Sequence, residues 1–249
     1  KPAWYIKTTA YKDKIIEANK KVNWYPNFVG EKRFANWLEN LVDWCISRNR
    51  YFGTPLNIWI CEKDNDMLVI KDIKELENLT NKKYTNIHPE YIFNTIIVKN
   101  NKEYKNVNLT FDCWFESGCS CLIEFNNKIK NLHIEQDYNK KICTFTKQKI
   151  FKPYDLCIEG IDQCRGYFYT SLIISTLLFN KPPFLNCICT GLILDENSKK
   201  LSKSSGNYQP PENYIINYGS DFLRLYLLGS VLVNGENLKF NVNDIKTYK

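Results

Sequence analysis

Two lysines and two serines within five residues form the part of this sequence best suited to phosphate chemistry. They are Lys200, Ser202, Lys203 and Ser204, in the segment TGLILDENSKKLSKSSGNY that runs from residue 190 to 208. Lysine ammonium groups suit phosphate as mobile point charges, and serine hydroxyls can add hydrogen bonds to its oxygens. Most basic turns of this kind are solvated loops, and these residues alone favour that interpretation.

A second polar group follows residues 155–158, which we expect to form a short buried strand. Glu159, Gly160, Asp162 and Gln163 come directly after it and lead into a helix. Glycine at position 160 lets a ligand approach the backbone closely. Asp162 also has a simpler interpretation, as the N-cap of that helix.

The elements that must hold these groups follow a strand, helix, strand, loop, helix order from residue 153 onward. Residues 165–179 are apolar nearly all round, which predicts a buried helix. This order is typical of a parallel α/β sheet, whose ligands bind beyond the carboxyl ends of the strands. We therefore expect residues 159–160 and the Lys200 loop on the same side of the sheet. The other predicted elements here are one or two strands over 184–194 and helices over 212–218 and 220–228.

The first 50 residues have a mostly helical pattern. Residues 44–50, WCISRNR, are interpreted as a helix end whose arginines face the C-terminal dipole. Residues 62–105 look peripheral, and no pattern places residues 119–152. The predicted elements are helices over 11–21, 30–40 and 70–79 and a strand over 56–61, with Phe34, Trp37, Leu38 and Leu41 on one helix face.

Ten cysteines and two histidines invite a metal or disulfide hypothesis, which their spacing does not support. No C-x-x-C pair occurs, and His88 and His133 lie near no paired cysteines, so zinc is not expected. The two C-x-C pairs, at 119/121 and 187/189, alternate as strand residues would. Scattered buried thiols are the preferred interpretation.

Length and composition set broad limits on the protein. The 249 residues carry a net charge of +7 and are 44% hydrophobic, enough for one large or two small domains. A basic balance permits a nucleic-acid or nucleotide partner without establishing one. No apolar run reaches membrane-spanning length, and the N-terminal residues have no signal-peptide layout. An intracellular, cytoplasmic protein is expected.

Five segments together resemble one family. Residues 200–204, KLSKS, look like the KMSKS motif of class I aminoacyl-tRNA synthetases, with leucine in place of methionine. Residues 158–168, IEGIDQCRGYF, resemble the segment that precedes this motif in the isoleucyl-tRNA synthetase branch. The segments WCISR at 44–48, DCWFESG at 112–118 and YGSDFLRLY at 218–226 fit the same branch in the same order. The eukaryotic cytosolic members are the most similar in style.

The resemblance implies an α/β fold, the second half of a Rossmann-like parallel-sheet catalytic domain with a helical C-terminal edge. Residues 1–61 would follow the editing insertion, 62–152 would be peripheral, 153–208 would complete the catalytic fold, and 209–249 would begin a helical region. The family's HIGH motif, its editing domain and its anticodon-binding bundle have no counterpart in these residues. We therefore expect a partial active site that is inactive by itself, completed by an upstream half of the same parent protein.

The implied reaction is activation of L-isoleucine by ATP, with Mg²⁺, followed by transfer to tRNA(Ile). Catalysis would come from positioning and from stabilising phosphate charge in the transition state. Lys203 is the expected pyrophosphate-contacting cation, with Lys200 beside it. The implied ATP-binding residues are Lys200, Ser202, Lys203, Ser204 and Gly191. The implied isoleucine- and adenylate-binding residues are Glu159, Gly160, Asp162, Gln163, Trp114 and Tyr167.

Two departures from the family affect the amino-acid pocket. Tyr167 stands where the family usually has tryptophan, and its hydroxyl needs a partner when buried. The Met-Pro-Tyr run that normally follows Ser117-Gly118 is replaced by CSCLI at 119–123. By residue type alone, Trp114 and Tyr167 would be core residues. An inactive RNA- or protein-binding derivative of a synthetase is the alternative, and a cysteine-rich redox or metal protein is a weaker one.

Overall fold

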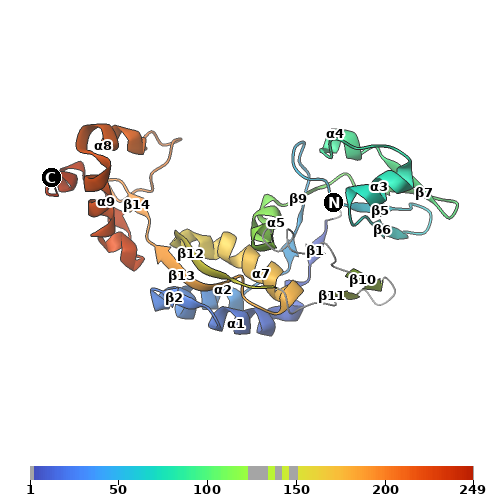
Figure 1. Cartoon of the computed structure of the whole chain (residues 1–249), viewed down its shortest axis with the longest axis horizontal. Helices are drawn as coiled ribbons and strands as arrows, with labels where there is room; N and C mark the ends of the chain where they lie inside the picture. The colour runs from blue at the N-terminus through green and yellow to red at the C-terminus, as the bar shows by residue number, and fades with distance from the viewer. Residues whose placement is uncertain (1–2, 123–133, 138–141, 146–150, 249) are drawn as a thin grey trace. The chain divides into compact units, whose positions relative to one another are not determined.

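The computed structural model describes residues 3–122, 134–137, 142–145 and 151–248 (Figure 1). The chain forms two compact units, each described here by itself. The first comprises Lys1–Thr9 and Val42–Ser117, and the second comprises Ala10–Leu41 and Gly118–Lys249. These units divide the chain differently from the four ranges expected from the sequence, because residues 10–41 pack with the C-terminal half.

The first unit contains a four-stranded antiparallel sheet in the order β6-β5-β8-β7. Its side chains Trp59, Leu76 and Ile97 are almost completely buried in one apolar cluster. Helix α3 begins three residues later than predicted because Asp72 caps it, accepting a hydrogen bond from the Glu75 amide. The elements are β5 (Ile58–Ile60), β6 (Met67–Val69), α3 (Ile73–Thr80), α4 (Pro89–Ile92), β7 (Ile96–Lys99) and β8 (Lys102–Asn106).

Two short antiparallel pairs complete this unit, and they correct the helix expected at residues 44–50. Strand β1 (Tyr5–Ile6) pairs with β3 (Trp44–Cys45), and β4 (Ser47–Arg48) pairs with β9 (Thr110–Phe111). The Arg48 guanidinium donates to the Cys45 and Ser47 carbonyls and forms an ion pair with Asp112, 2.6 Å away. This arginine therefore holds an extended backbone in place instead of facing a helix dipole.

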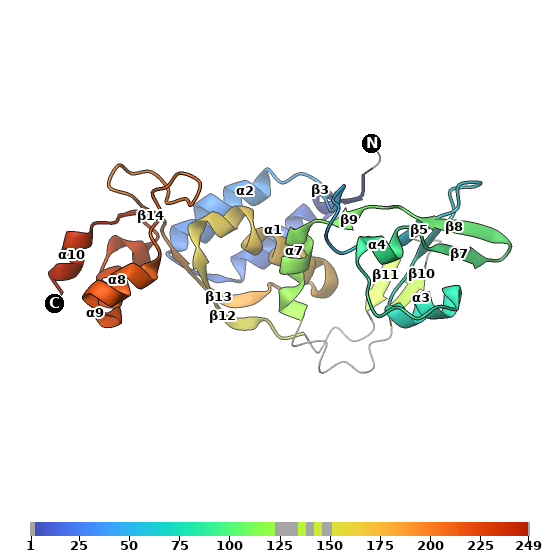
Figure 2. The ribbon, with the colours of Figure 1, turned by 90° about the horizontal axis from the view of Figure 1, so that it is seen from above.

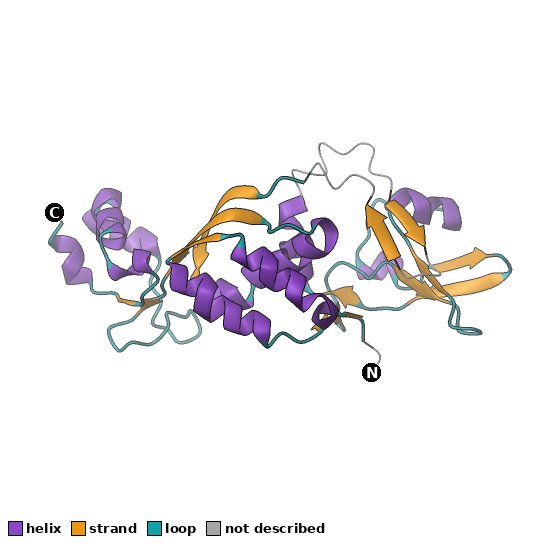
Figure 3. Cartoon of the chain, turned by 90° about the horizontal axis from the view of Figure 1, so that it is seen from below, coloured by secondary structure: helices purple, strands orange, loops and turns teal. Residues whose placement is uncertain are grey.

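The second unit is built on three parallel strands in the order β12-β13-β2. The parallel pairing of β12 and β13 follows the predicted pattern, whereas β2 was not predicted as a strand. Figures 2 and 3 show helices α1 (Lys12–Lys20), α2 (Ala35–Glu39) and α7 (Tyr167–Phe179) gathered on one side of these strands. Nine residues of α7 are buried, which confirms the predicted buried helix. The elements are α1 (Lys12–Lys20), β2 (Asn23–Tyr25), a π-helical turn Val29–Phe34 leading into α2 (Ala35–Glu39), β12 (Tyr154–Gly160), α7 (Tyr167–Phe179) and β13 (Phe184–Thr190).

Strand β12 lies at the edge of the sheet and is not the buried strand expected from its apolar residues. Leu156 and Ile158 are 50% and 56% exposed. Within the described residues, α1, α2 and α7 lie on one side of the sheet only, which leaves Leu156 and Ile158 open to solvent. Parallel sheets are normally covered on both faces, so burial was the reasonable expectation from the sequence.

Aromatic rings fill the space between the sheet and its helices. Trp24 of β2 meets Phe34, Phe168 and Phe184 edge-on, with ring centroids 5.3–5.9 Å apart. Gly30 packs directly on the Trp24 ring and leaves no room for a side chain, since a Cβ atom added there would lie 2.0 Å from the ring. The predicted apolar face of residues 30–40 is confirmed at Phe34 and Leu38, which are fully buried.

A helical segment follows the sheet. Helices α8 (Pro211–Tyr218), α9 (Ser220–Leu228) and α10 (Val242–Lys246) pack around Leu223, Tyr226 and Ile245. Strand β14 (Ile193–Leu194) pairs in parallel with β15 (Leu238–Lys239) and ties the segment to the end of the sheet. Other elements are the antiparallel pair β10 (Ile134–Asp137) and β11 (Ile142–Phe145), helix α5 (Cys113–Gly118), and the 3₁₀ helices Thr8–Tyr11 and Val231–Asn234.

The two C-x-C pairs differ in conformation. Cys187 and Cys189 lie on β13 and are fully buried, as predicted for a strand. Cys119 and Cys121 lie instead in a 3₁₀ turn, Cys119–Leu122. Two alternating residues are too short a pattern to distinguish a strand from such a turn. No helix in the described part of the chain has the length and apolar character needed to cross a membrane.

Candidate functional site

The carboxyl ends of β12 and β13 lie side by side, as predicted. Gly160 is the register partner of Thr190, so residues 159–163 and 190–194 leave the sheet at the same edge. The Lys200 loop follows, and Lys200 Nζ lies 3.7 Å from Asp162 Oδ2. Both side chains are about half exposed, so the surrounding solvent screens this pair strongly. The fold therefore brings the two predicted polar groups together in one exposed place.

The residues after β12 form a short 3₁₀ turn, Ile161–Arg165, that leads into α7. Gly160 occupies the N-cap position, and Asp162 lies in the first turn, so the N-cap interpretation of Asp162 was wrong. Gln163 accepts a hydrogen bond from the Tyr167 amide, 3.0 Å from its Oε1. Its side chain thus satisfies an otherwise open donor at the start of α7. Glu159 is exposed at the end of the strand.

The half-buried Tyr167 hydroxyl has a hydrogen-bond partner, as expected for a tyrosine in such a position. Its Oη lies 3.0 Å from Ser120 Oγ, and the Tyr154 hydroxyl donates to the Ser120 carbonyl at 2.8 Å. Burial raises the pKa of Tyr167, and the Ser120 hydrogen bond offsets part of that effect. The two departures from the family, at position 167 and at 119–123, therefore contact each other.

The KLSKS loop holds its functional groups in intrachain contacts. Lys203 Nζ lies over the Tyr208 ring, 5.6 Å from its centroid, and the Ser202 and Ser204 hydroxyls lie 2.7 Å apart. Gly206 has a φ of +69°, a backbone conformation that favours glycine, and a Cβ atom added there would meet no heavy atom within 4 Å. The loop therefore presents its ammonium groups and hydroxyls at an open surface.

Gly191 has a packing role that the sequence did not reveal. Its amide donates to the Leu232 carbonyl at 2.8 Å, and a Cβ atom would lie 1.8 Å from the Glu236 carbonyl oxygen. Only glycine allows the segment before β15 to approach so closely. Its predicted contact with ATP stays a prediction.

Trp114 belongs to the first unit, where Asp112 positions it. The Asp112 carboxylate accepts hydrogen bonds from the Trp114 amide at 3.2 Å and from the Trp44 indole at 3.2 Å, besides pairing with Arg48. Asp112 is 4% exposed, whereas Trp114 is 43% exposed. A buried carboxylate therefore supports an exposed indole on α5.

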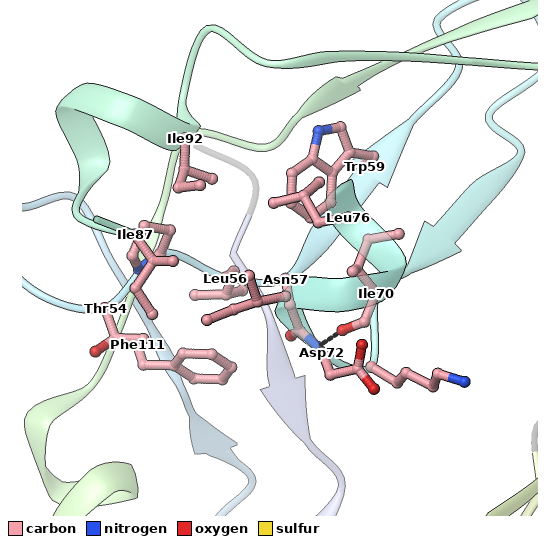
Figure 4. Close-up of a pocket in the computed structure, with 13 residues that line it drawn as sticks. Thr54, Leu56, Asn57, Trp59, Ile70, Asp72, Leu76, Ile87, Ile92 and Phe111 are labelled. Atoms are coloured by element: carbon pink, nitrogen blue, oxygen red, sulfur yellow. Dashed lines mark hydrogen bonds between the residues drawn. The ribbon is translucent and has the colours of Figure 1, made fainter. Parts of the chain in front are cut away.

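A cavity of about 190 Å³ lies in the first unit between β5 and α3 (Figure 4). Its wall is mostly apolar, and Asn57 on that wall donates to the Ile70 carbonyl at 2.6 Å. None of the predicted site residues lines this cavity. A second cavity, of about 360 Å³, adjoins the KLSKS loop in the second unit.

Three thiols near the site, those of Cys164, Cys187 and Cys189, are buried. Cys187 and Cys189 have sulfur atoms 3.8 Å apart, and burial raises the pKa of Cys164 to about 12. Thiolates, not thiols, are the reactive and metal-binding form. Within the described ranges, no three His, Cys, Asp or Glu side chains are placed to hold a metal ion. His133 lies outside those ranges.

The family model for class I tRNA synthetases (I, L, M and V) matches residues 1–239. The chain belongs to this family. Three relatives of this class I synthetase chain are named isoleucine–tRNA ligases, each aligned over 98% of it. They are from Enterocytozoon bieneusi (42% identical, 26% of the relative covered), Caenorhabditis elegans (41%, 20% covered) and Chlamydia abortus (40%, 22% covered). The chain thus spans about a quarter or less of their length.

Two solved class I synthetases share the fold and confirm the predicted α/β class. One is the agnB2 LeuRS of Agrobacterium radiobacter K84, solved in a ternary complex with tRNA and LeuAMS. It matches with a TM-score of 0.59 and 20% identity, and the match covers 88% of this chain and 29% of the LeuRS chain. Mycobacterium tuberculosis methionyl-tRNA synthetase, in complex with methionyl-adenylate, has a TM-score of 0.54 at 15% identity and covers 98% and 36%.

Several residues of this synthetase chain that organise the site were not predicted from its sequence. They share one property: each forms a hydrogen bond with a predicted site residue or within the KLSKS loop. Short polar residues at loop ends often have this role, which was the available signal. These residues are Asp112, Ser120, Asp195 and Asn207.

Proposed function

We propose that this chain is part of an isoleucine–tRNA ligase and supplies the KLSKS side of its active site. The proposed reaction joins the isoleucine carboxylate to the α-phosphate of ATP and releases pyrophosphate. The resulting isoleucyl-adenylate then passes its acyl group to tRNA(Ile). The remainder of the site, with the editing unit, would come from further sequence of the same protein, working in the cytoplasm.

The observation that carries this proposal is the meeting of the KLSKS loop with the end of β12. Lys200 Nζ lies 3.7 Å from Asp162 Oδ2, so two segments about 40 residues apart in the chain form one surface that carries both positive and negative groups. An ATP phosphate chain needs cations, and an amino acid's ammonium group needs a carboxylate. Relatives 40–42% identical to the chain are named isoleucine–tRNA ligases, which supports isoleucine as the amino acid.

The lysines have the proposed electrostatic role. Lys203 would leave the Tyr208 ring and bind the pyrophosphate group, with Lys200 beside it. Each ammonium group would stabilise phosphate charge that moves in the transition state. Ser202, Ser204 and Gly191 would complete the ATP contacts. Mg²⁺ would arrive with ATP and neutralise further phosphate charge, and no protein-bound zinc is proposed.

The amino-acid side of the site would be formed by the residues after β12 and by the aromatic ring of Tyr167. Glu159 and Asp162 provide carboxylates, Gly160 allows close approach of the adenylate, and Gln163 holds the start of α7. Tyr167 would form a wall of the isoleucine pocket, and the role of Trp114 in that pocket rests on the family resemblance alone. Because the Tyr167 hydroxyl is bonded to Ser120, the pocket wall would present its ring and keep its polar tip satisfied.

A chimera tests this proposal directly. Residues 1–239 replace the matching segment of the Enterocytozoon bieneusi ligase, and isoleucine-dependent exchange of pyrophosphate into ATP is measured. We expect exchange with isoleucine in preference to valine or leucine. Lys203→Ala should reduce the rate by about 10²–10³-fold, as expected for one transition-state donor.

The matched control is Lys239→Ala, because Lys239 is an exposed lysine on the strand beside β14. This variant should leave the exchange rate unchanged. Preference for another amino acid would contradict the substrate, and an unchanged rate for Lys203→Ala would contradict the role of that lysine. A folded chimera that binds tRNA without any exchange would favour the non-catalytic alternative.

A further inference from the structure

The KLSKS loop is closed at its base by two side chains that the proposed reaction does not use. Asp195 Oδ2 accepts a hydrogen bond from Asn207 Nδ2 at 2.8 Å. Asp195 begins the loop and Asn207 ends it, so this single contact joins the two ends of a 13-residue segment. Both side chains are partly buried.

Asp195 also organises the first half of the loop. Its Oδ1 accepts the backbone amides of Asn197 at 2.9 Å and Lys199 at 2.8 Å. The Asp195 amide donates to the Lys199 carbonyl at 2.8 Å, and Ser198 adopts a left-handed φ of +62° to make the turn. The carboxylate thus holds the backbone directly before Lys200. The Asn207 and backbone hydrogen bonds lower its pKa.

Asn207 organises the second half of the loop. Its Oδ1 accepts the Ser202 amide at 2.9 Å, and its Nδ2 also lies 3.3 Å from the Lys200 carbonyl oxygen. These bonds hold the backbone on both sides of Leu201. Asp195 and Asn207 together therefore bind the backbone of Lys199, Lys200 and Ser202, which carry or flank the reactive groups.

Packing does not explain the shape of this loop. Lys203, Ser204 and Gly206 are exposed, and the loop borders the cavity of about 360 Å³ instead of resting on a filled core. A loop with few packed side chains depends on polar contacts to keep one conformation. Asp195, Leu201 and Asn207 line this cavity on the loop side, and Leu223, Leu227 and Phe240 line it on the helical side.

We propose that Asp195 and Asn207 form a clasp that positions Lys200 and Lys203 for phosphate binding. They are positioning residues, because their bonds go to each other and to the loop backbone. The phosphate-binding role in this inference rests on the proposed function. The contact between Asp195 and Asn207 does not depend on it. The bonds to the carboxylate are charge-assisted and are the stronger kind.

A charge-swap cycle tests the pairing. In Asp195→Asn, two amide groups face each other with donors on both sides. In Asn207→Asp, two carboxylates lie in contact and repel. In the double variant, the amide introduced at position 195 can donate to the carboxylate introduced at position 207 and still accept from the backbone at 197 and 199. That carboxylate can in turn still accept the Ser202 amide, so only the weaker 3.3 Å bond to the Lys200 carbonyl is lost.

The first readout is hydrogen exchange of the amides over residues 196–204 in the 249-residue chain. Each single variant should accelerate exchange there by about tenfold, the effect of losing a charge-assisted bond. The double variant should return to within about threefold of the natural chain. Glu196→Gln removes a neighbouring exposed carboxylate and should leave exchange unchanged. Additive effects without rescue would overturn the clasp.

The second readout is pyrophosphate exchange by the chimera carrying the same variants. A positioning pair should lower kcat about tenfold in each single variant, leave the KM for isoleucine unchanged, and recover in the double variant. Unchanged kcat in the single variants of an active chimera would overturn the positioning role. If the unmodified chimera is inactive, the proposed function fails while hydrogen exchange still decides whether the clasp exists.

Discussion

Replacing Asp112 by alanine should destabilise the first unit more than any exposed carboxylate substitution in it. Asp112 is 4% exposed, and its carboxylate accepts from the Trp114 amide, the Trp44 indole and the Arg48 guanidinium, with a weaker contact to the Cys113 thiol. It also lies directly before α5, where a carboxylate caps the helix. The substitution removes all of these contacts together, so it tests the support of Trp114.

The magnitude follows from the burial of each contact. Loss of a helix cap costs about 1 kcal/mol. Removing the acceptor of the buried Trp44 indole costs about 1–3 kcal/mol. The side chain of Arg48 is 36% exposed, so screening limits its pair to about 1 kcal/mol or less. Together these contacts predict that Asp112→Ala lowers the free energy of unfolding by about 2–5 kcal/mol. Asp112→Asn should cause a smaller loss, because its single acceptor oxygen cannot replace both carboxylate oxygens.

The assay is urea unfolding, with hydrogen exchange over residues 44–48 and 110–117 assigning the transition to the first unit. Asp43→Ala is the matched control, since Asp43 also accepts a backbone amide, from Thr9 at 3.0 Å, but at the surface. It should cause a clearly smaller loss. A loss below about 1 kcal/mol for Asp112→Ala, or one equal to that of the control, would refute this account of the site's support.

Three further predictions concern other contacts. Gly191→Ala should lower the unfolding midpoint of the second unit, because the new Cβ would lie 1.8 Å from the Glu236 carbonyl oxygen; an unchanged midpoint would contradict that packing. Asp64 has a pKa lowered to about 2, mainly by its hydrogen bond to Lys102. The stabilising contribution of Asp64 should be present above pH 3.8 and lost as the pH falls through about 2. Lys102→Ala should move the pKa of Asp64, measured by NMR titration, up towards 3.8. A pKa of Asp64 near the ordinary aspartate value in the natural chain would speak against the pair. Tyr167 has a pKa raised by burial, so it should ionise above the ordinary tyrosine range, and its contribution to stability should be complete below pH 10 and lost as the pH rises through the higher value. The ultraviolet difference between the natural chain and Tyr167→Phe measures this, and ionisation within or below the ordinary range would argue against burial.

Much of the fold around the site was predictable from the sequence. A nearly continuous apolar stretch predicted α7, and the strand, helix, strand order predicted the parallel pairing of β12 and β13, because both signals depend on residues close in the chain. The parallel order in turn placed residues 159–160 and the KLSKS loop at one edge of the sheet. The phosphate-binding role of Lys200 and Lys203 came from the family resemblance, because the residue types alone favoured a solvated loop, and it stays a prediction.

Side-chain partners across long sequence distances could not be predicted in this way. Ser120 and Tyr167 are 47 residues apart, and Arg48 and Asp112 are 64 residues apart. Their pairing depends on how the elements pack, which no local pattern encodes. The exposure of β12 was likewise decided by which face of the sheet the helices cover.

The sequence by itself determined which groups could do chemistry and on which kind of elements they lie, because side-chain type and periodicity are local properties. Only the tertiary structure decided which groups meet. It placed Lys200 against Asp162 and joined Asp195 to Asn207 across the base of the loop. A hydrogen bond requires atoms about 3 Å apart, and the folded chain alone sets that distance.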